Sequence, residues 1–548
     1  MNKNVSHKFH SKPFVWALLL VTTFFSAKAQ DRPKLVVGIV VDQMKTEYLY
    51  RFANDFGSGG FKRLTSNGFT FYNAHFNYMP TYTGPGHASV YTGTTPRFHG
   101  IVGNDWYNKS IKKNMYCTDD ASVRTLGAGD EAEGKMSPKN LKATTITDEL
   151  KLSTNFRGKV IGMSMKDRGA ILPAGHFADC AFWYSKTGAF ISSTFYRNEL
   201  PAWATKFNDE KHFLKYVQND WNPLKPLAQY DESLADENPY EGKIFKANTA
   251  TFPYDLKSMY EKSGAQILRA LPFGNDLLTD FALAAIDAEQ LGKDNHTDFL
   301  AISYSATDYV GHITGPRSIE LQDTYVRLDA SLEKLLKYLD EKVGKGQYLV
   351  FLTADHAGAE NPVFLKDHKY EVENVSSKDF VNKLEAFGLA TFGEDVIANC
   401  SNQNIFFDKD ALAGTGISLT DAKNKVRDFV MKESWVLRVY TEEEILASSG
   451  SDPYLQLIAN GYDTKQNGEL VILESPGTLE DHTTGTTHGS VFSYDTHVPI
   501  IFFGKGITAG KSHEKCVTTE IAPTLAQLLQ LSLPNATNAE VLEALFKN

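Results

Sequence analysis

The chain has 548 residues, of which 42% are hydrophobic and 12% aromatic, and its formal net charge is −10 at pH 7. This length allows one large domain with insertions, or two to three ordinary domains, around a sizeable core. The negative charge argues against nonspecific nucleic-acid binding, and no nucleic acid is expected as a specific partner.

The N-terminal segment has the pattern of a secretory signal peptide. Lysines precede an apolar run from Phe14 to Phe25, and Ala27 and Ala29 supply the small residues of a cleavage site before Gln30. The run is too short to span a bilayer comfortably, and a retained signal anchor is the alternative. We predict that residues 1–29 are removed, that the protein is periplasmic or secreted, and that it does not contact the membrane after cleavage.

Short apolar runs predict buried strands, and residues 318–339 have leucines at the spacing of a helix. Unbroken runs of β-branched and aromatic residues suit strands that are covered on both faces. Their alternation with helical stretches predicts an α/β fold, a doubly wound and mostly parallel sheet with helices on both faces. The predicted strands are residues 35–41, 160–163, 299–303, 348–352 and 498–503.

Two long stretches interrupt this alternation within the predicted domain, residues 30–548. Residues from about 175 to 275 are rich in Trp, Tyr, Phe and Asn and predict an aromatic insertion. Residues from about 360 to 480 mix short strand-like and helix-like pieces and predict a second insertion.

The mature chain contains four cysteines, and an exported protein can form disulfides. None of them has the CxxC spacing of a cysteine zinc site, and their pairing stays open. They are Cys117, Cys180, Cys400 and Cys516.

Residues 81–93 place Thr83 before Gly-Pro-Gly and a helix-compatible run. Taken alone, this stretch is explained by a threonine that caps a helix and by the preference of glycine and proline for turns.

Acidic residues follow three of the predicted strands: Asp42, Asp308 and Asp355. Each one alone is more simply explained as a helix cap. In an open α/β sheet, however, ligands bind outside the carboxyl ends of the strands, so these residues are expected to meet at one edge. Histidines accompany them at positions 312 and 356, and a further loop supplies His488.

Three carboxylates and three imidazoles suit zinc better than magnesium or calcium. Six ligands exceed the need of one tetrahedral ion, so the pattern predicts two zinc ions per chain.

These motifs, in this order, resemble the alkaline phosphatase superfamily, and within it the PafA-type alkaline phosphatases of bacteria. The resemblance spans about residues 33–540. The pieces that carry it are Val40-Val-Asp42, Thr83-Gly-Pro-Gly-His87, Gly103-Asn104-Asp105, Met165-Lys166-Asp-Arg168-Gly-Ala170, Asp308-x-x-Gly-His312, Ala354-Asp355-His356 and Thr487-His488-Gly489.

The resemblance implies two zinc sites and a nucleophile. Asp308, His312 and His488 would hold one zinc; Asp42, Asp355 and His356 would hold the other, with Thr83 as its fourth ligand. Thr83 would attack phosphorus to form a phosphothreonine that water then hydrolyses. Gly84 and Gly86 are expected to form a tight turn before a helix whose N-terminus faces the phosphate.

The resemblance also implies a phosphate clamp made of Asn104, Lys166 and Arg168. The charges of two zinc ions, three aspartates and the Thr83 alkoxide sum to zero. The two positive charges of the lysine and arginine would then match the two negative charges of a phosphate monoester. Lys166 and Arg168 are two residues apart, and in an extended segment their side chains would point the same way.

The remaining threonines and histidines near these motifs are expected to be structural. This set comprises Thr81, Thr92, His87, His482 and His497; each of the three histidines could instead support the site from outside the ligand sets.

The resemblance implies an exported phosphomonoesterase with a broad range of phosphate monoesters, an alkaline optimum and a monomeric state. The alternative is a phosphodiesterase or nucleotide pyrophosphatase on the same scaffold, although those enzymes lack an equivalent Lys-x-Arg pair. A sulfatase, a phosphoglycerate mutase and a noncatalytic phosphate-binding protein fit the motifs less well.

Overall fold

The computed structural model describes residues 1–3, 32–128 and 131–547, and the chain from Pro33 to Asn548 forms one compact unit. The predicted signal peptide falls almost entirely outside the described residues. Among the helices that are described, none has both the length and the apolar character of a membrane span.

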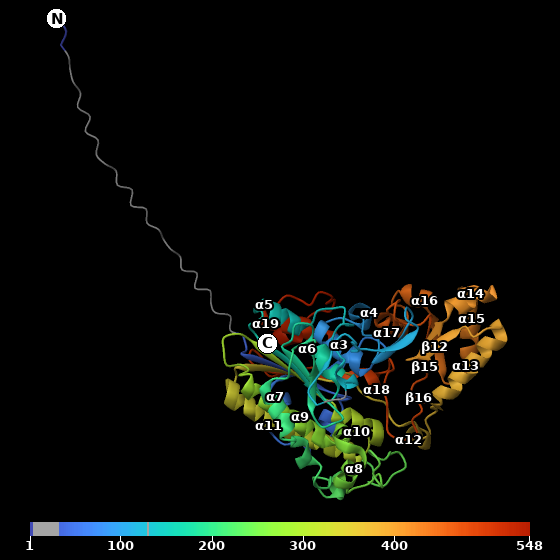
Figure 1. Cartoon of the computed structure of the whole chain (residues 1–548), viewed down its shortest axis with the longest axis horizontal. Helices are drawn as coiled ribbons and strands as arrows, with labels where there is room; N and C mark the ends of the chain where they lie inside the picture. The colour runs from blue at the N-terminus through green and yellow to red at the C-terminus, as the bar shows by residue number, and fades with distance from the viewer. Residues whose placement is uncertain (4–31, 129–130, 548) are drawn as a thin grey trace. The chain divides into compact units, whose positions relative to one another are not determined.

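A mixed sheet of eleven strands lies at the centre of this unit (Figure 1). Its middle is parallel: β1 pairs with β9 and β10, and β6 pairs with β9 and β7. The strands are β1 (Leu35–Val41), β2 (Phe69–His75), β5 (Thr125–Leu126), β6 (Val160–Ser164), β7 (Cys180–Tyr184), β8 (Phe190–Ser193), β9 (Asp298–Tyr304), β10 (Tyr348–Thr353), β17 (His497–Gly504), β18 (Gly510–Ser512) and β19 (Cys516–Val517).

Two groups of helices cover the sheet, and Figure 1 shows them on its opposite sides. All residues of β1, β9 and β10 are buried between them, because a strand covered on both faces has no position for a solvated side chain. This arrangement confirms the predicted doubly wound α/β fold. One group contains α3 (Thr83–Thr92), α5 (Ile146–Ser153), α6 (Asp167–Ala174) and α19 (Ile521–Leu529); the other contains α7 (Ala202–Asp209), α9 (Pro272–Ala288), α10 (Ala306–Thr314) and α11 (Ile319–Leu339).

The helix predicted at 318–339 is confirmed as α11. The side chain of Ser318 caps it by accepting a hydrogen bond from the backbone N–H of Leu321, 3.1 Å away. Its leucines face the core, as their spacing predicts.

Strand β17 differs from the prediction of a parallel strand, because it runs antiparallel to both of its neighbours, β10 and β2. An apolar run indicates that a strand is buried, but not whether it runs parallel or antiparallel to its neighbours. The sequence therefore could not predict the direction of β17. The antiparallel direction has a consequence for function: the N-terminal end of β17, not its C-terminal end, lies beside the carboxyl end of β10.

The two long stretches differ in how they relate to the main sheet. Part of residues 175–275 extends it through β7 and β8, and the remainder contains α7, α8 (Leu256–Ser263) and the 3₁₀ helix η4 (Gly264–Ala270). Residues 360–480 contain a separate antiparallel sheet with its own apolar core. The proposed insertion boundaries themselves stay a prediction.

The elements of this second stretch are α12 (Pro362–Asp367), β11 (Asn374–Val375), α13 (Ser377–Phe392), β12 (Ile397–Ser401), β13 (Asn404–Phe407), α14 (Lys409–Thr415), α15 (Leu419–Val430), β14 (Val436–Thr441), α16 (Glu442–Leu446), α17 (Pro453–Gly461), β15 (Leu470–Glu474) and β16 (Leu479–Glu480). Its sheet has the order β12-β13-β15-β14.

All four cysteines are free thiols in this structure. Cys117, Cys180 and Cys516 are buried, and Cys400 is partly buried.

Candidate metal centre and nucleophile

Four loops meet at one edge of the main sheet. Asp42 follows β1, Asp308 lies in the first turn of α10 after β9, and Asp355 follows β10. The fourth loop leads into β17 and carries His488. Backbone hydrogen bonds join it to the loop after β10: Ala357 donates to the carbonyl of Asp495 at 2.8 Å, and Ala359 donates to that of Thr487 at 3.0 Å. Because β17 is antiparallel, its entry loop reaches the same edge as the strand-end acids.

The closed group consists of Asp42, Asp355 and His356, and its side chains have no exposed surface. His356 Nε2 lies 3.4 Å from Asp42 Oδ1 and 3.6 Å from Asp355 Oδ2. None of these three atoms has a hydrogen-bond partner among the described residues. Buried polar atoms without partners cost free energy, so their convergence on one point indicates a site that can bind a cation.

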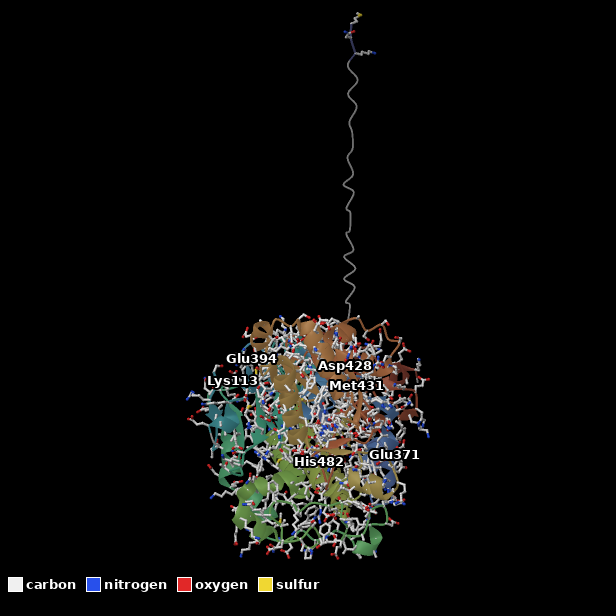
Figure 2. The ribbon with its side chains drawn as sticks, turned by 90° about the vertical axis from the view of Figure 1, so that its right-hand side faces the viewer. Lys113, Glu371, Glu394, Asp428, Met431 and His482 are labelled. Atoms are coloured by element: carbon white, nitrogen blue, oxygen red, sulfur yellow. The ribbon has the colours of Figure 1, made fainter. Side chains whose placement is uncertain are left out.

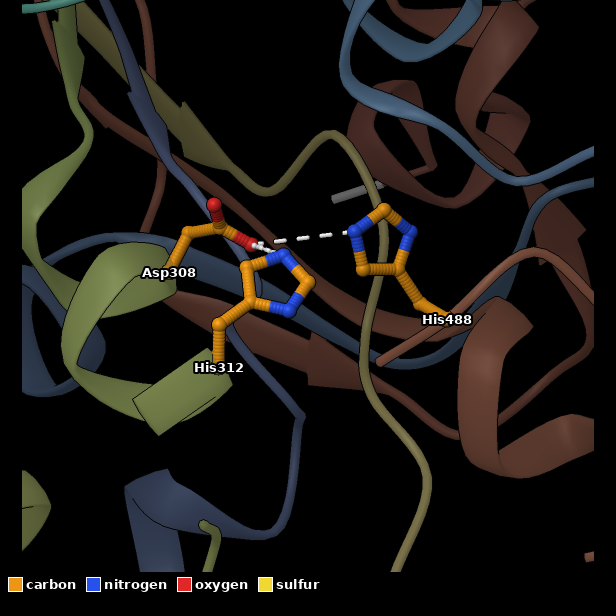
Figure 3. Close-up of side chains that lie close together, drawn as sticks. All are labelled: Asp308, His312 and His488. Carbon is orange, nitrogen blue, oxygen red and sulfur yellow. Dashed lines mark ion pairs between the residues drawn. The ribbon is translucent and has the colours of Figure 1, made fainter. Parts of the chain in front are cut away.

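The open group consists of Asp308, His312 and His488 (Figure 3). His312 Nε2 lies 3.1 Å and His488 Nε2 3.7 Å from the same oxygen, Asp308 Oδ1. The His312 side chain is 31% exposed, which distinguishes this group from the closed one.

Hydrogen bonds to the backbone fix the orientation of all three histidines. Nδ1 of His312 lies 2.8 Å from the carbonyl oxygen of Thr486, that of His488 2.7 Å from Thr81, and that of His356 2.8 Å from Ala357.

A carbonyl can only accept, so each Nδ1 carries a proton, and in the neutral ring Nε2 offers its lone pair to the carboxylates. Lone pairs that face carboxylate oxygens repel unless a cation lies between them. Both groups therefore fit a metal ion bound by nitrogen and oxygen, with an outer hydrogen bond that holds each imidazole in place.

The electrostatics of the carboxylates support this conclusion. Burial, followed by the charge of Asp308, raises the pKa of Asp42 to about 6, and burial with the charge of Asp42 raises the pKa of Asp355 well above its ordinary value. Burial also acts to raise the pKa of Asp308, but His312 and Lys166 hold it well below its usual range. Lys166 and a protonated His312 thus compensate only part of the negative charge of three buried acids.

Thr83 is the first residue of α3, and its side chain is buried beside Lys166, which contacts both groups. The Lys166 Nζ lies 3.5 Å from Thr83 Oγ1. The N-terminus of a helix carries free N–H groups and a partial positive charge, which favours an anion at this position.

The expected Gly-Pro-Gly turn is wrong, because Gly84, Pro85 and Gly86 form the first turn of α3 itself. Proline is tolerated there, since the first N–H groups of a helix have no partner within it. Gly86 serves close packing instead: a Cβ at this position would lie 2.1 Å from the backbone oxygen of Asp355. The missing side chain lets the Thr83 turn approach the closed group.

Lys166 connects the two groups. Its Nζ lies 2.7 Å from Asp42 Oδ2 and 2.6 Å from Asp308 Oδ2, and its side chain is 2% exposed. Burial alone would lower the pKa of Lys166, but Asp308 and Asp42 raise it above its ordinary value, so the lysine is charged.

The expectation that Lys166 and Arg168 lie in one extended segment is wrong. Lys166 caps α6 and Arg168 is the second residue of that helix. Arg168 Nη1 donates to the hydroxyl of Tyr116 at 2.9 Å, and Tyr116 donates to Asp167 at 2.6 Å. Lys166 and Arg168 nevertheless line the same cavity of about 240 Å³, with Tyr116 and Tyr309.

Asn104 contacts α3, the helix that begins at Thr83. Its Oδ1 accepts a hydrogen bond from the N–H of Gly84 at 2.8 Å, which orients the amide beside Thr83.

Gln43 is a residue that the sequence analysis missed. It adopts a left-handed conformation with φ of 62°, donates its N–H to Asp355 Oδ1 at 3.2 Å, and donates Nε2 to Asp308 Oδ1 at 2.8 Å. A Cβ on Gly311 would lie 2.2 Å from Gln43 Oε1, so the glycine between Asp308 and His312 makes room for it. Its position directly after Asp42 was the only available signal.

The residues expected to be structural divide into two kinds. Thr92 bonds the carbonyl of Ala88, and His497 Nε2 lies 2.7 Å from the carbonyl oxygen of Tyr72, so both are structural. Thr81, His87 and His482 adjoin the metal groups: Thr81 binds His488 through its carbonyl, the His87 ring lies 3.4 Å from Asp355, and the His482 ring lies 6.4 Å from that of His312.

Two groups of aspartates and histidines at the strand ends of a doubly wound sheet define a hydrolase of the alkaline phosphatase superfamily. The chain belongs to the type I phosphodiesterase/nucleotide pyrophosphatase family, whose model matches residues 36–490.

Known relatives agree with this placement. Alkaline phosphatase PafA of Elizabethkingia meningoseptica is 44% identical over 96% of this chain and 97% of its own length. Alkaline phosphatase PhoV of Synechococcus elongatus is 42% identical over 94% of this chain and 93% of its own length. The crystal structure of wild-type PafA superposes with a TM-score of 0.91 over 94% of this chain and 99% of that one.

Proposed function

We propose that this chain is an alkaline phosphatase that hydrolyses phosphate monoesters through a covalent phosphothreonine on Thr83. Its phosphomonoesterase class rests on relatives that are named alkaline phosphatases and match almost the whole chain. One observation carries the mechanism: Thr83 lies at a helix N-terminus beside Lys166, which pairs with an acid of each metal group.

We propose zinc as the metal, with one ion in each group, because aspartate and histidine donors in sets of three suit it. When bound, the ions supply Lewis acidity, which lowers the pKa of coordinated oxygen groups and neutralises negative charge. The packing of Gly86 against Asp355 supports a position of Thr83 on the side of the closed group, whose carboxylates would orient its metal.

In the first step, Thr83 Oγ1 forms a bond to phosphorus while the bond from phosphorus to the ester oxygen breaks. The helix N-terminus and Lys166 stabilise negative charge on the transferred group. In the second step, water attacks the same phosphorus and releases phosphate and free Thr83.

Asn104, Lys166 and Arg168 are the proposed phosphate clamp. A solved variant of PafA carries replacements at a threonine, an asparagine, a lysine and an arginine. Those residue types occur here as Thr83, Asn104, Lys166 and Arg168, with the same spacing along the chain. Arginine and lysine can exploit the second charge of a monoester.

The second candidate activity is phosphodiester hydrolysis, which the description of the matching family favours. The two cationic side chains at the nucleophile favour the monoester, because a diester has one negative charge fewer.

We further propose export to the periplasm or the medium, a broad range of monoesters, an alkaline optimum and a monomeric state. These proposals rest on the signal-like sequence of residues 1–29 and on the relatives.

The purified protein should be assayed with a phosphate monoester, a phosphate diester and a sulfate ester, before and after chelation. The monoester should be the best substrate, and its hydrolysis should stop with EDTA and return with zinc. A diester rate above the monoester rate would favour the second candidate.

A further inference from the structure

A cavity of about 310 Å³ adjoins the open group. Its wall contains His488, Tyr82, which precedes Thr83, and residues between β15 and His482, most of which belong to the 360–480 stretch. His482 belongs to this wall and is labelled in Figure 2. The second stretch thus forms one side of a space that opens beside the reacting residues.

The geometry of phosphoryl transfer indicates on which side of phosphorus this cavity lies. Attacking and leaving oxygens lie roughly in line through phosphorus. Gly86, in the same helical turn as Thr83, packs on Asp355 of the closed group, so an attack by Thr83 from that side would direct the leaving oxygen toward the open group, to which His488 belongs. We propose, on the basis of the proposed function, that this cavity binds the alcohol part of the ester and selects leaving groups that carry a positive charge.

The charge of the wall carries this proposal. Four carboxylates line the cavity, Glu474, Glu480, Asp481 and Asp495, whereas its described lining contains no lysine or arginine. Burial and the neighbouring Glu480 raise the pKa of Glu474 well above its ordinary value, because the two acids repel when both are ionised. An ammonium group between them would relieve this repulsion.

Two buried atoms of the wall independently indicate a ligand that donates hydrogen bonds. Asp495 is 1% exposed, and its Oδ2 accepts from the N–H groups of Gly489 and Ser490 and from the Ser490 hydroxyl. Its Oδ1 has no hydrogen-bond partner among the described residues, and neither does Oγ1 of Thr478, which is 4% exposed. An ammonium group has three donors to offer such atoms.

The cavity beside Arg168 has the opposite character. Lys166, Arg168 and Arg269 line it, so an anionic leaving group would be drawn to that side rather than to the acidic wall. The acidic cavity therefore favours a positively charged leaving group, whereas the cavity beside Arg168 favours a negatively charged one.

The test compares two monoesters of similar size, 2-aminoethyl phosphate and n-propyl phosphate. Their alcohols differ in intrinsic reactivity, so the informative quantity is how a mutation changes the ratio of their kcat/KM values. Glu480→Gln and Glu474→Gln should each lower the ratio of aminoethyl to propyl ester about tenfold or more, the loss of one charge-assisted contact. The propyl phosphate rate should stay near the parental value, which also shows that the variants fold.

Glu394→Gln is the matched control, because Glu394 is an exposed glutamate of the same stretch that does not line the cavity. Figure 2 shows Glu394 well separated from His482. An unchanged ratio in both cavity variants, or an equal fall in the control, would overturn the proposal. If the parent enzyme hydrolysed neither ester, the proposed function would fail, and the inference with it.

Discussion

The closed group and the open group use the same ligand types but in different proportions. The closed group has two aspartates and one histidine, all without exposed surface, and the open group has one aspartate and two histidines, of which His312 is 31% exposed. A divalent ion would leave the closed group neutral and the open group with one positive charge. In the proposed mechanism the two groups would have different roles: the closed group would hold Thr83, and the open group would meet the charged oxygen that leaves.

The largest expected effect concerns the nucleophile beside the closed group. Thr83→Ala should lower monoester kcat/KM by at least about 10³-fold, because it removes the hydroxyl that forms the proposed covalent intermediate. Thr83→Ser keeps the hydroxyl and should stay within about tenfold of the parent. Phosphate label trapped from substrate and located by peptide mapping should be found on Thr83; label on Ser89 or Thr92 would contradict the assignment.

The second prediction concerns Lys166, which joins the two groups, and its partner Arg168. The double change Lys166→Ala/Arg168→Ala should lower monoester kcat/KM by on the order of 10²–10⁴-fold, if the two charge-assisted contacts are additive. The diester rate should fall much less. Arg97→Ala/Lys113→Ala removes the same charge from exposed positions and should leave both rates unchanged. Equal losses for both substrates in the first variant would assign the pair a general positioning role.

The third prediction compares how fast the closed group and the open group release their metal ions. During chelation, the ion of the open group should leave before that of the closed group, because His312 is accessible to water and the closed group is not. Elemental analysis during exposure to EDTA should find two zinc ions per chain at first, then one. His312→Ala should abolish the fast phase and His356→Ala the slow one; a single phase in the parent would show that the groups do not differ.

The smallest expected effect concerns the contact between α3 and the closed group. Gly86→Ala would place a methyl group 2.1 Å from the Asp355 oxygen and should destabilise the fold by about 1–3 kcal/mol. Gly388→Ala is the control, because the nearest atom to a Cβ in that helix lies 3.6 Å away. Thermal unfolding of both variants measures the difference, and equal unfolding temperatures would refute the packing role.

The sequence was most informative where a local pattern decides the structure. Strand runs, the leucine spacing of α11 and acids at strand ends are visible in short windows, and the edge of a parallel sheet brings such acids together. Apart from Thr83, the two ligand groups that the family resemblance implies consist of the same residues as the two groups whose donor atoms lie within 4.8 Å of one another in the structure.

Features that depend on packing were not predictable. The direction of β17 is set by its neighbours, and the approach of α3 to the closed group depends on Gly86 lying against Asp355, in a loop far away in the chain. Gln43 belongs to no motif, and its role follows from its hydrogen bonds to Asp355 and Asp308, for which Gly311 makes room.

The position of β17 also determines when during synthesis the protein can become active. Strand β2 lies early in the sequence. It joins the main sheet through β17, which is synthesised late and lies between β2 and β10. A growing chain that ends before the loop leading into β17 lacks both His488, which this loop carries, and the partner strand of β2. Catalytic competence therefore arises only when nearly the whole polypeptide has emerged, and contacts between such distant segments form slowly.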